Sequence, residues 1–89
     1  MHKYVVRFGE NKMAIGFVLI NVSPGVEKKV FDTMIKWDEI QELYPLFGDY
    51  DLIAKIQAPD YESLSDIVVN KIRAIKGVTE TKTLTGAKF

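Results

Sequence analysis

A glycine and two carboxylates lie together at positions 48–51 (GDYD), between two strand-like runs, Glu42–Phe47 and Leu52–Ala58. Glycine tolerates a positive φ, so backbone N–H groups beside Gly48 can turn towards a small ligand. The carboxylates of Asp49 and Asp51 can receive an ammonium group. Taken alone, this GDYD segment is more simply interpreted as an ordinary tight turn. Only the surrounding residues can distinguish a turn from a binding site.

A row of threonines gives the second set of polar groups. The strand-like run Val78–Thr85 places Thr79, Thr81, Thr83 and Thr85 on one face. Threonine is a good strand former, so its β-strand propensity alone is enough to explain the row. If the row meets the GDYD segment, it brings hydroxyls beside carboxylates, and such a lining suits a zwitterionic amino acid.

The other reactive groups do not form a catalytic or metal-binding set. His2 is the only histidine and lies at the terminus, and there is no cysteine. Asp49 and Asp51, without further acidic neighbours, make a poor calcium or magnesium site. General acid–base work by this pair is possible but has no third group to support it. We therefore expect no catalytic residue, no metal ion and no cofactor.

The composition narrows the class of protein. The chain has 89 residues, 47% of them hydrophobic, which fits one small globular domain. Lys plus Arg is 12 and Asp plus Glu is 12, so the formal net charge is zero. This balance argues against a free-standing nucleic-acid binder and against a polybasic membrane patch. No apolar run approaches membrane-spanning length, and we expect a cytoplasmic protein.

The strands are the elements that must position these groups. Ala14–Val22 is β-branched, aromatic and almost free of charge, which is typical of a strand. The other expected strands are Lys3–Phe8, Ile40–Phe47, Leu52–Ala58 and Val78–Thr85.

Two helices are expected between the strands. Ser23 suits an N-cap and Pro24 suits the first position of a helix whose apolar stripe is Val26, Val30, Met34 and Trp37, widened by Phe31 and Ile35. Asp60 suits the N-cap of a second helix, which Gly77 ends. Its expected buried stripe is Tyr61, Leu64, Val68, Ile72 and Ile75.

This order of elements predicts an α+β fold. The sequence βαββαβ is the ferredoxin-like arrangement, an antiparallel sheet with two helices on one face. Both faces of Ala14–Val22 are apolar, because Val18 and Ile20 lie on one face while Phe17 and Leu19 lie on the other. Two helices cover only one face of such a sheet, so we expect the second face to pack against another protein surface in a sheet-mediated homodimer.

At this point the residues resemble a known family, the C-terminal effector-binding (RAM) domain of the Lrp/AsnC transcription regulators. The matching signature is the apolar strand, then Gly48-Asp49-Tyr50-Asp51, then Ala58-Pro59-Asp60 opening the second helix, then Gly77-Val78-x-x-Thr81-x-Thr83. The match covers roughly residues 13–89, which we take as the ligand-binding domain, and leaves residues 1–12 as an N-terminal extension.

The resemblance implies sheet-mediated dimers that assemble into tetramers or octamers, with amino-acid effectors bound between dimers. It places the ligand-binding residues at Gly48, Asp49, Tyr50, Asp51, Thr81 and Thr83. It singles out Asp51, whose counterpart position governs the effector response, and we assign Asp51 to the ligand ammonium group, helped by Asp49 and by the hydroxyls of Thr81 and Thr83. Family regulators also carry a helix-turn-helix domain, for which residues 1–12 are too short. We therefore expect a stand-alone effector domain that does not bind DNA directly.

Three functions fit these features. The first is a small-molecule sensor without catalysis, which binds an amino acid or related metabolite and modulates full-length Lrp/AsnC regulators by mixed assembly. The second is a small dimeric α+β barrel enzyme, which uses the same βαββαβ unit but usually has a histidine or a cofactor in its pocket. The third is a purely structural oligomerisation module. A fold alone does not decide among these functions. We favour the sensor over the enzyme, because the sequence offers no internal histidine.

Overall fold

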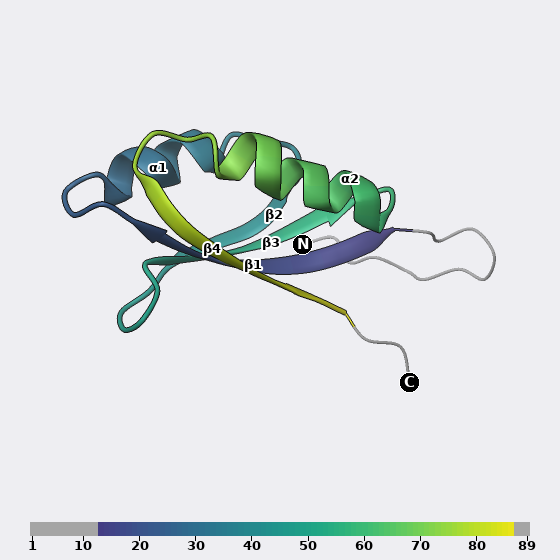
Figure 1. Ribbon diagram of the computed structural model, residues 1–89, viewed down its shortest axis with the longest axis horizontal. Coiled ribbons are helices and arrows are strands. Elements are labelled where there is room, and N and C mark those ends of the chain that lie inside the picture. Colours follow the sequence, from purple (N-terminus) through teal and green to yellow (C-terminus); the bar gives the residue numbers. More distant parts are fainter. Residues whose placement is uncertain (1–12, 87–89) are drawn as a thin grey trace.

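The apolar run Ala14–Val22 forms strand β1 in the computed structural model, which describes residues 13–86. It lies inside an antiparallel sheet of order β2-β3-β1-β4, where β2 is Ile40–Pro45, β3 is Leu52–Ala58 and β4 is Val78–Thr85. The helical segments α1 (Glu27–Met34), α2 (Tyr61–Asp66) and η1 (Ile67–Ile72) all cover the same face of the sheet (Figure 1). The ferredoxin-like α+β architecture expected from the sequence is therefore confirmed.

The core lies between this sheet face and the helices. Side chains at alternate positions of β1 point into it, and Ala14, Val18 and Ile20 are completely buried. β3 contributes the equivalent alternate set, of which Leu52 and Ala54 are examples. Burying these apolar side chains is the main source of stability for a sheet covered on one face.

The loop before α1 differs from the sequence expectation. Ser23 was expected to cap the helix, but its carbonyl accepts a hydrogen bond from Val26 N–H (3.3 Å), which closes a turn with Pro24 second and Gly25 third. Gly25 has φ +92°, the left-handed conformation that a type II turn requires at its third position. The helix therefore begins only at Glu27, and Val26 occupies the cap position without a side-chain hydrogen bond.

α1 also ends earlier than expected, at Met34, so its buried apolar stripe is shorter than predicted. Val30 and Met34 are buried, and Trp37 packs against the core from the turn that follows. Ile35 is exposed because it lies at the C-cap, where the chain turns away from the sheet.

The second helix begins as predicted but does not continue as a regular α-helix. Asp60 caps it, because its carboxylate accepts a hydrogen bond from Ser63 N–H at 2.7 Å. From Ile67 the chain widens into the π-helix η1, in which Arg73 N–H donates to the carbonyl of Val68, five residues back (2.9 Å).

This widening changes which residues are buried. The wider turn directs the adjacent residues Ile67 and Val68 both into the core. Tyr61, expected in the buried stripe, is exposed at the start of the helix, and Ile75 is only partly buried. Gly77 has φ +106° and lies in the turn that precedes β4, beyond the Arg73 C-cap, so it starts the strand rather than ending the helix.

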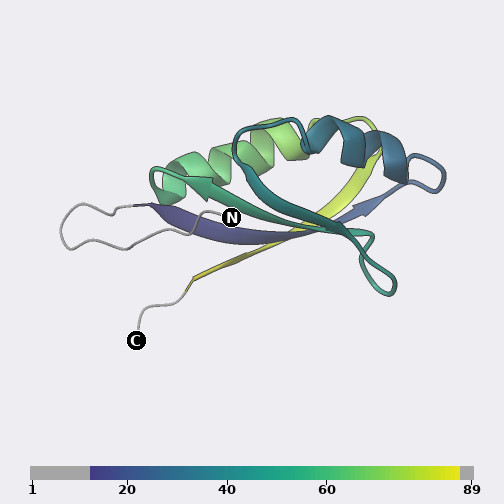
Figure 2. The same ribbon diagram turned by 180° about the vertical axis from the view of Figure 1, so that it is seen from behind.

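The hairpin between β2 and β3 projects beyond the end of the sheet (Figure 2). β2 ends at Pro45, two residues before the expected Phe47, and the hydrogen bond from Leu46 N–H to the carbonyl of Asp51 (2.8 Å) closes the hairpin beyond it. The expected strand Lys3–Phe8 and His2 lie outside the described residues. Within residues 13–86, no helix is long and apolar enough to cross a membrane.

Candidate functional site

Asp51 is fixed to the end of the sheet by three hydrogen bonds. Its backbone N–H donates to the carbonyl of Ile20 (2.9 Å), and its own carbonyl accepts from Leu46 N–H (2.8 Å). One carboxylate oxygen, Oδ2, accepts from Val22 N–H at 2.8 Å. Val22 is where the pairing between β1 and β4 shifts register, so the side chain of Asp51 occupies a break in the ladder. Asp51 therefore keeps one carboxylate oxygen, Oδ1, for another partner.

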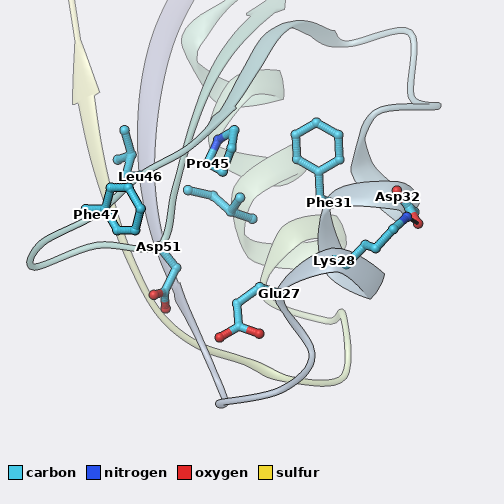
Figure 3. A pocket seen from close by; sticks show the side chains of 9 residues that line it. Glu27, Lys28, Phe31, Asp32, Pro45, Leu46, Phe47 and Asp51 are labelled. Carbon is cyan, nitrogen blue, oxygen red and sulfur yellow. Dashed lines mark hydrogen bonds and ion pairs between the residues drawn. The ribbon is translucent and has the colours of Figure 1, made fainter.

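An open cavity of about 580 Å³ lies beside Asp51, between α1 and the β2–β3 hairpin (Figure 3). Its apolar walls come from both sides: Phe31 from α1, and Pro45, Leu46, Phe47 and Leu52 from the hairpin. Its charged residues are Glu27, Lys28, Asp32 and Asp51. Small-molecule sites combine apolar walls with a few convergent polar groups, and this cavity has that composition.

The charges in this cavity are predominantly negative. Lys28 is paired with Asp32 (Nζ–Oδ2 2.8 Å), which leaves the carboxylates of Glu27 and Asp51 without a cationic partner among the described residues. Glu27 holds the turn before α1, since its Oε1 accepts from Gly25 N–H (3.0 Å). Figure 3 shows Glu27 and Asp51 on the same side of the opening. Such a pair favours a ligand that carries an ammonium or another cationic group.

The rest of the GDYD segment forms the exposed hairpin tip. Gly48 has φ +113°, as expected for a glycine that permits the turn. Asp49 is exposed and Tyr50 is half-buried, and neither they nor Gly48 lines the cavity. Of the hairpin residues expected to bind a ligand, only Asp51 therefore reaches the cavity of its own chain. Phe47, beside the tip, is completely exposed.

Thr81 and Thr83 lie elsewhere. In the sheet they stand opposite Ile20 and Val18, which places their side chains on the helix-covered face. Thr81, Thr83 and Thr85 line a shallow groove between β4 and the second helical segment, together with Tyr61, Val69 and Arg73. Within one chain the structure does not bring these hydroxyls into the cavity of Asp51.

Sequence reasoning missed the helix side of the site. Phe31 and Glu27 belong to α1, where Phe31 was expected only to widen the apolar stripe and Glu27 was not singled out. The signal was present in part, because Phe31 widens the apolar stripe beyond what the sheet covers. Within residues 13–86, no group of three or more His, Cys, Asp or Glu side chains could hold a metal ion.

The sheet face opposite the helices forms a second surface. Phe17 stands opposite Leu84 on β4, and Leu19 stands opposite Ile53 on β3. Phe17 is 40% exposed and Leu84 is 47% exposed, so these apolar side chains are incompletely covered in one chain, and the same face also carries charged residues such as Lys55 and Lys82. We call Ile15, Phe17, Leu19, Tyr44, Ile53 and Leu84 the open sheet face.

The sequence of this chain is similar to part of the sequences of known transcription regulators. The profile of the Lrp/AsnC ligand binding domain matches residues 15–85. An HTH-type transcriptional regulator, FL11, from Pyrococcus abyssi is 36% identical over 70 residues, which cover 79% of this chain and 46% of the regulator. An uncharacterised HTH-type transcriptional regulator from Pyrococcus furiosus is 30% identical over 90 residues, 94% of this chain and 60% of its own length. The chain thus spans about half the length of these curated relatives.

Comparison with solved structures gives the same fold. FFRP-DM1 superposes with a TM-score of 0.80 at 27% identity, over 83% of this chain and 99% of that chain. A Thermus thermophilus protein, TTHA0845, gives a TM-score of 0.79 at 29% identity, over 85% of this chain and 95% of that one. Escherichia coli AsnC gives 0.84 at 21% identity, over 100% of this chain and 60% of its own, and that likeness concerns the fold alone.

Proposed function

The chain belongs to the Lrp/AsnC ligand-binding domain family, and we propose that it is an effector-binding domain whose ligand is an amino acid or a related small metabolite. The observation that carries this proposal is the position of Asp51. Its carboxylate is anchored by Val22 and opens onto a cavity with apolar walls. A domain of this family with one pre-positioned acceptor beside an apolar wall is suited to a ligand that has both an ammonium group and an apolar part.

The ligand would use both sides of the cavity. Its ammonium group would bind Oδ1 of Asp51, with Glu27 as a second acceptor, and its apolar part would lie against Phe31 and Leu52. Its carboxylate would face the backbone N–H groups around Gly48 of a neighbouring chain, because Gly48 does not line the cavity of its own chain. Asp49, Tyr50, Thr81 and Thr83 would join this site only from a neighbouring chain, because they do not line the cavity within one chain.

We propose a homodimer formed through the open sheet face, with dimers assembling further into tetramers or octamers. An apolar surface centred on Phe17 and Leu84 is typical of a protein–protein contact. The same domain occurs in relatives that are named HTH-type regulators, so this chain could join full-length family members in mixed assemblies and change their response. Direct DNA binding by the chain is not part of this proposal, given its zero net charge.

The relatives are transcription regulators, which points away from an enzyme. The dimeric α+β barrel enzyme would use a pocket between sheet and helices, and the cavity beside Asp51 supplies carboxylates there but no histidine. We therefore propose a sensor without catalytic residues or a cofactor. The cytoplasmic location expected from the sequence stays a prediction.

The test is a thermal-shift screen of the protein with the twenty amino acids, followed by calorimetry on each hit. A charge-assisted hydrogen bond contributes roughly 1.5–3 kcal/mol, so Asp51→Asn should weaken the hit about ten- to a hundred-fold. Asp38→Asn is the matched control, because it removes the same charge from an exposed turn that lies outside the cavity. Equal affinity in Asp51→Asn and Asp38→Asn, with both variants folded, would exclude Asp51 from the site.

A further inference from the structure

Two phenylalanine rings line the cavity beside Asp51, and they come from different elements. Phe31 extends from α1, and Phe47 lies in the β2–β3 hairpin, just beyond the end of β2. Figure 3 shows the two rings on opposite sides of the opening, with Pro45 between them. A flat group that enters between the helix and the hairpin therefore has an aromatic wall on each side.

The two rings are held to different degrees. Phe31 is partly buried and packs against the core, so α1 fixes its position. Phe47 is completely exposed and follows directly after Leu46, whose N–H closes the hairpin on the carbonyl of Asp51 (2.8 Å). An exposed side chain changes rotamer within nanoseconds, so the Phe47 ring can settle onto a ligand that already rests on Phe31.

The surroundings of Phe47 give its exposure a meaning. A single exposed apolar side chain needs no explanation by itself. Phe47, however, borders a cavity whose other apolar walls are Phe31, Pro45, Leu46 and Leu52. A ligand that fills this space removes apolar surface of both partners from water, which favours binding.

The charged part of the cavity lies apart from the rings. In Figure 3 the carboxylates of Glu27 and Asp51 are both below Phe31 and Phe47. Oδ2 of Asp51 is bound to Val22 N–H, and Oδ1 is the oxygen left for a ligand. The cavity is therefore divided into an acidic part and an aromatic part, and a ligand that fills both has an ammonium group at one end and an apolar group at the other.

We propose that the apolar group of this ligand is an aromatic ring held between Phe31 and Phe47, so that the ligand is an aromatic amino acid or a closely related aromatic amine. This inference rests on the proposed function, because it concerns the same cavity and keeps the ligand ammonium group on Asp51. It adds the feature by which the site distinguishes one amino acid from another.

The preference for a ring over an aliphatic side chain has a physical cause. Aliphatic and aromatic groups both gain from leaving water, but paired aromatic rings also attract each other in offset-stacked or edge-to-face arrangements. Here the ligand ring has two such partners, one on each side. The cavity of about 580 Å³ also lies within the range of small-molecule sites and has room for a bulky side chain.

Calorimetry with phenylalanine and cyclohexylalanine tests the ring contacts directly. The two ligands share the same backbone and a ring of the same carbon count, but only phenylalanine has a π system. Two ring contacts should make phenylalanine bind roughly five-fold tighter or more. In the thermal-shift screen, phenylalanine, tyrosine and tryptophan should likewise give larger shifts than leucine, isoleucine and methionine.

Phe47→Leu assigns the preference to this cavity. Because Phe47 is completely exposed, the variant should fold normally, and it keeps an apolar side chain while it loses the ring. Affinity for phenylalanine should fall about two- to ten-fold, whereas affinity for cyclohexylalanine should change little. The matched control is Tyr61→Leu, which removes an exposed ring (55%) on α2, outside the cavity, and should alter neither affinity.

The outcomes separate this inference from the proposed function. If a non-aromatic amino acid bound more tightly than the aromatic ones and lost affinity in Asp51→Asn, the proposed function would stand and the aromatic preference would be wrong. If no amino acid bound, both would be wrong. If Phe47→Leu lowered the particle mass in light scattering but left the ratio of the two affinities unchanged, Phe47 would serve a contact between copies, and the inference would be overturned.

Discussion

Asp51→Ala separates the structural role of this carboxylate from its proposed role in ligand binding. In the structure Oδ2 accepts from Val22 N–H at 2.8 Å, and Val22 is only 7% exposed. The pairing of β1 with β4 shifts register between Asn21 and Val22, so the ladder at that point is irregular. Removing the carboxylate therefore removes the acceptor of a nearly buried donor.

The magnitude follows from the cost of an unsatisfied buried donor. Leaving a buried N–H without a partner costs about 1–3 kcal/mol, a substantial part of the 5–15 kcal/mol that stabilises a typical domain. For a domain of this size, that corresponds to a decrease in Tm of roughly 5–20 °C. Asp51→Asn keeps an oxygen that can accept from Val22 and loses only the charge assistance, so its cost should be about 1 kcal/mol or less.

Urea unfolding followed by circular dichroism measures these differences directly. Asp49→Ala is the matched control, because Asp49 lies in the same exposed loop and makes no hydrogen bond among the described residues. Its free energy of unfolding should stay within about 0.5 kcal/mol of the parent protein. If Asp51→Ala were as stable as Asp49→Ala, the hydrogen bond to Val22 would not contribute to folding, and the anchoring of Asp51 described above would be wrong.

Three further predictions concern the fold and its assembly. Phe17→Lys should reduce the particle mass in light scattering while the circular dichroism stays native, because Phe17 is on the open sheet face; an unchanged mass would exclude that face as the dimer contact. Gly77→Ala should lower the free energy of unfolding by more than Gly48→Ala, which should cost roughly 1–2 kcal/mol. Both glycines have positive φ, but only at Gly77 would a Cβ meet another side chain, Val26 Cγ2 at 2.7 Å. Equal costs of the two substitutions in urea unfolding would contradict this. The hydrogen bond from Ser63 N–H lowers the pKa of Asp60 in the folded protein. The stability that ionised Asp60 contributes is therefore present above its unfolded-state pKa and is lost as the pH falls below about 4. Asp60→Asn should flatten that part of the curve of unfolding free energy against pH.

The strands were predictable because their signal is local. β1, β3 and β4 have the expected boundaries, since runs of β-branched residues and the punctuating Pro59 and Gly77 determine them from neighbouring residues alone. The cap at Asp60 is local in the same sense. These features need no knowledge of what lies across the fold.

The helices were less predictable, because their geometry depends on the packing partner. The predicted buried positions Leu64, Val68 and Ile72 are confirmed, but Tyr61 is exposed at the start of α2 and the wider turn of η1 buries Ile67 beside Val68. At the start of α1, Ser23 followed by Pro24 resembles a helix cap, but Gly25 adopts a positive φ and closes a turn instead. A sequence pattern does not distinguish these outcomes, since both use the same residue types.

The binding site shows where local reasoning ends. The GDYD segment was identified from its glycine and carboxylates, yet only Asp51 reaches the cavity, and its orientation depends on Val22, 29 positions away in the sequence. That hydrogen bond exists because β1 breaks its register with β4 at the same point. The cavity wall then comes from Phe31, a residue whose helical spacing predicts a core position. The residue type that could bind an ammonium group is therefore visible in the sequence, whereas the geometry that makes Asp51 suitable arises from pairing between distant segments.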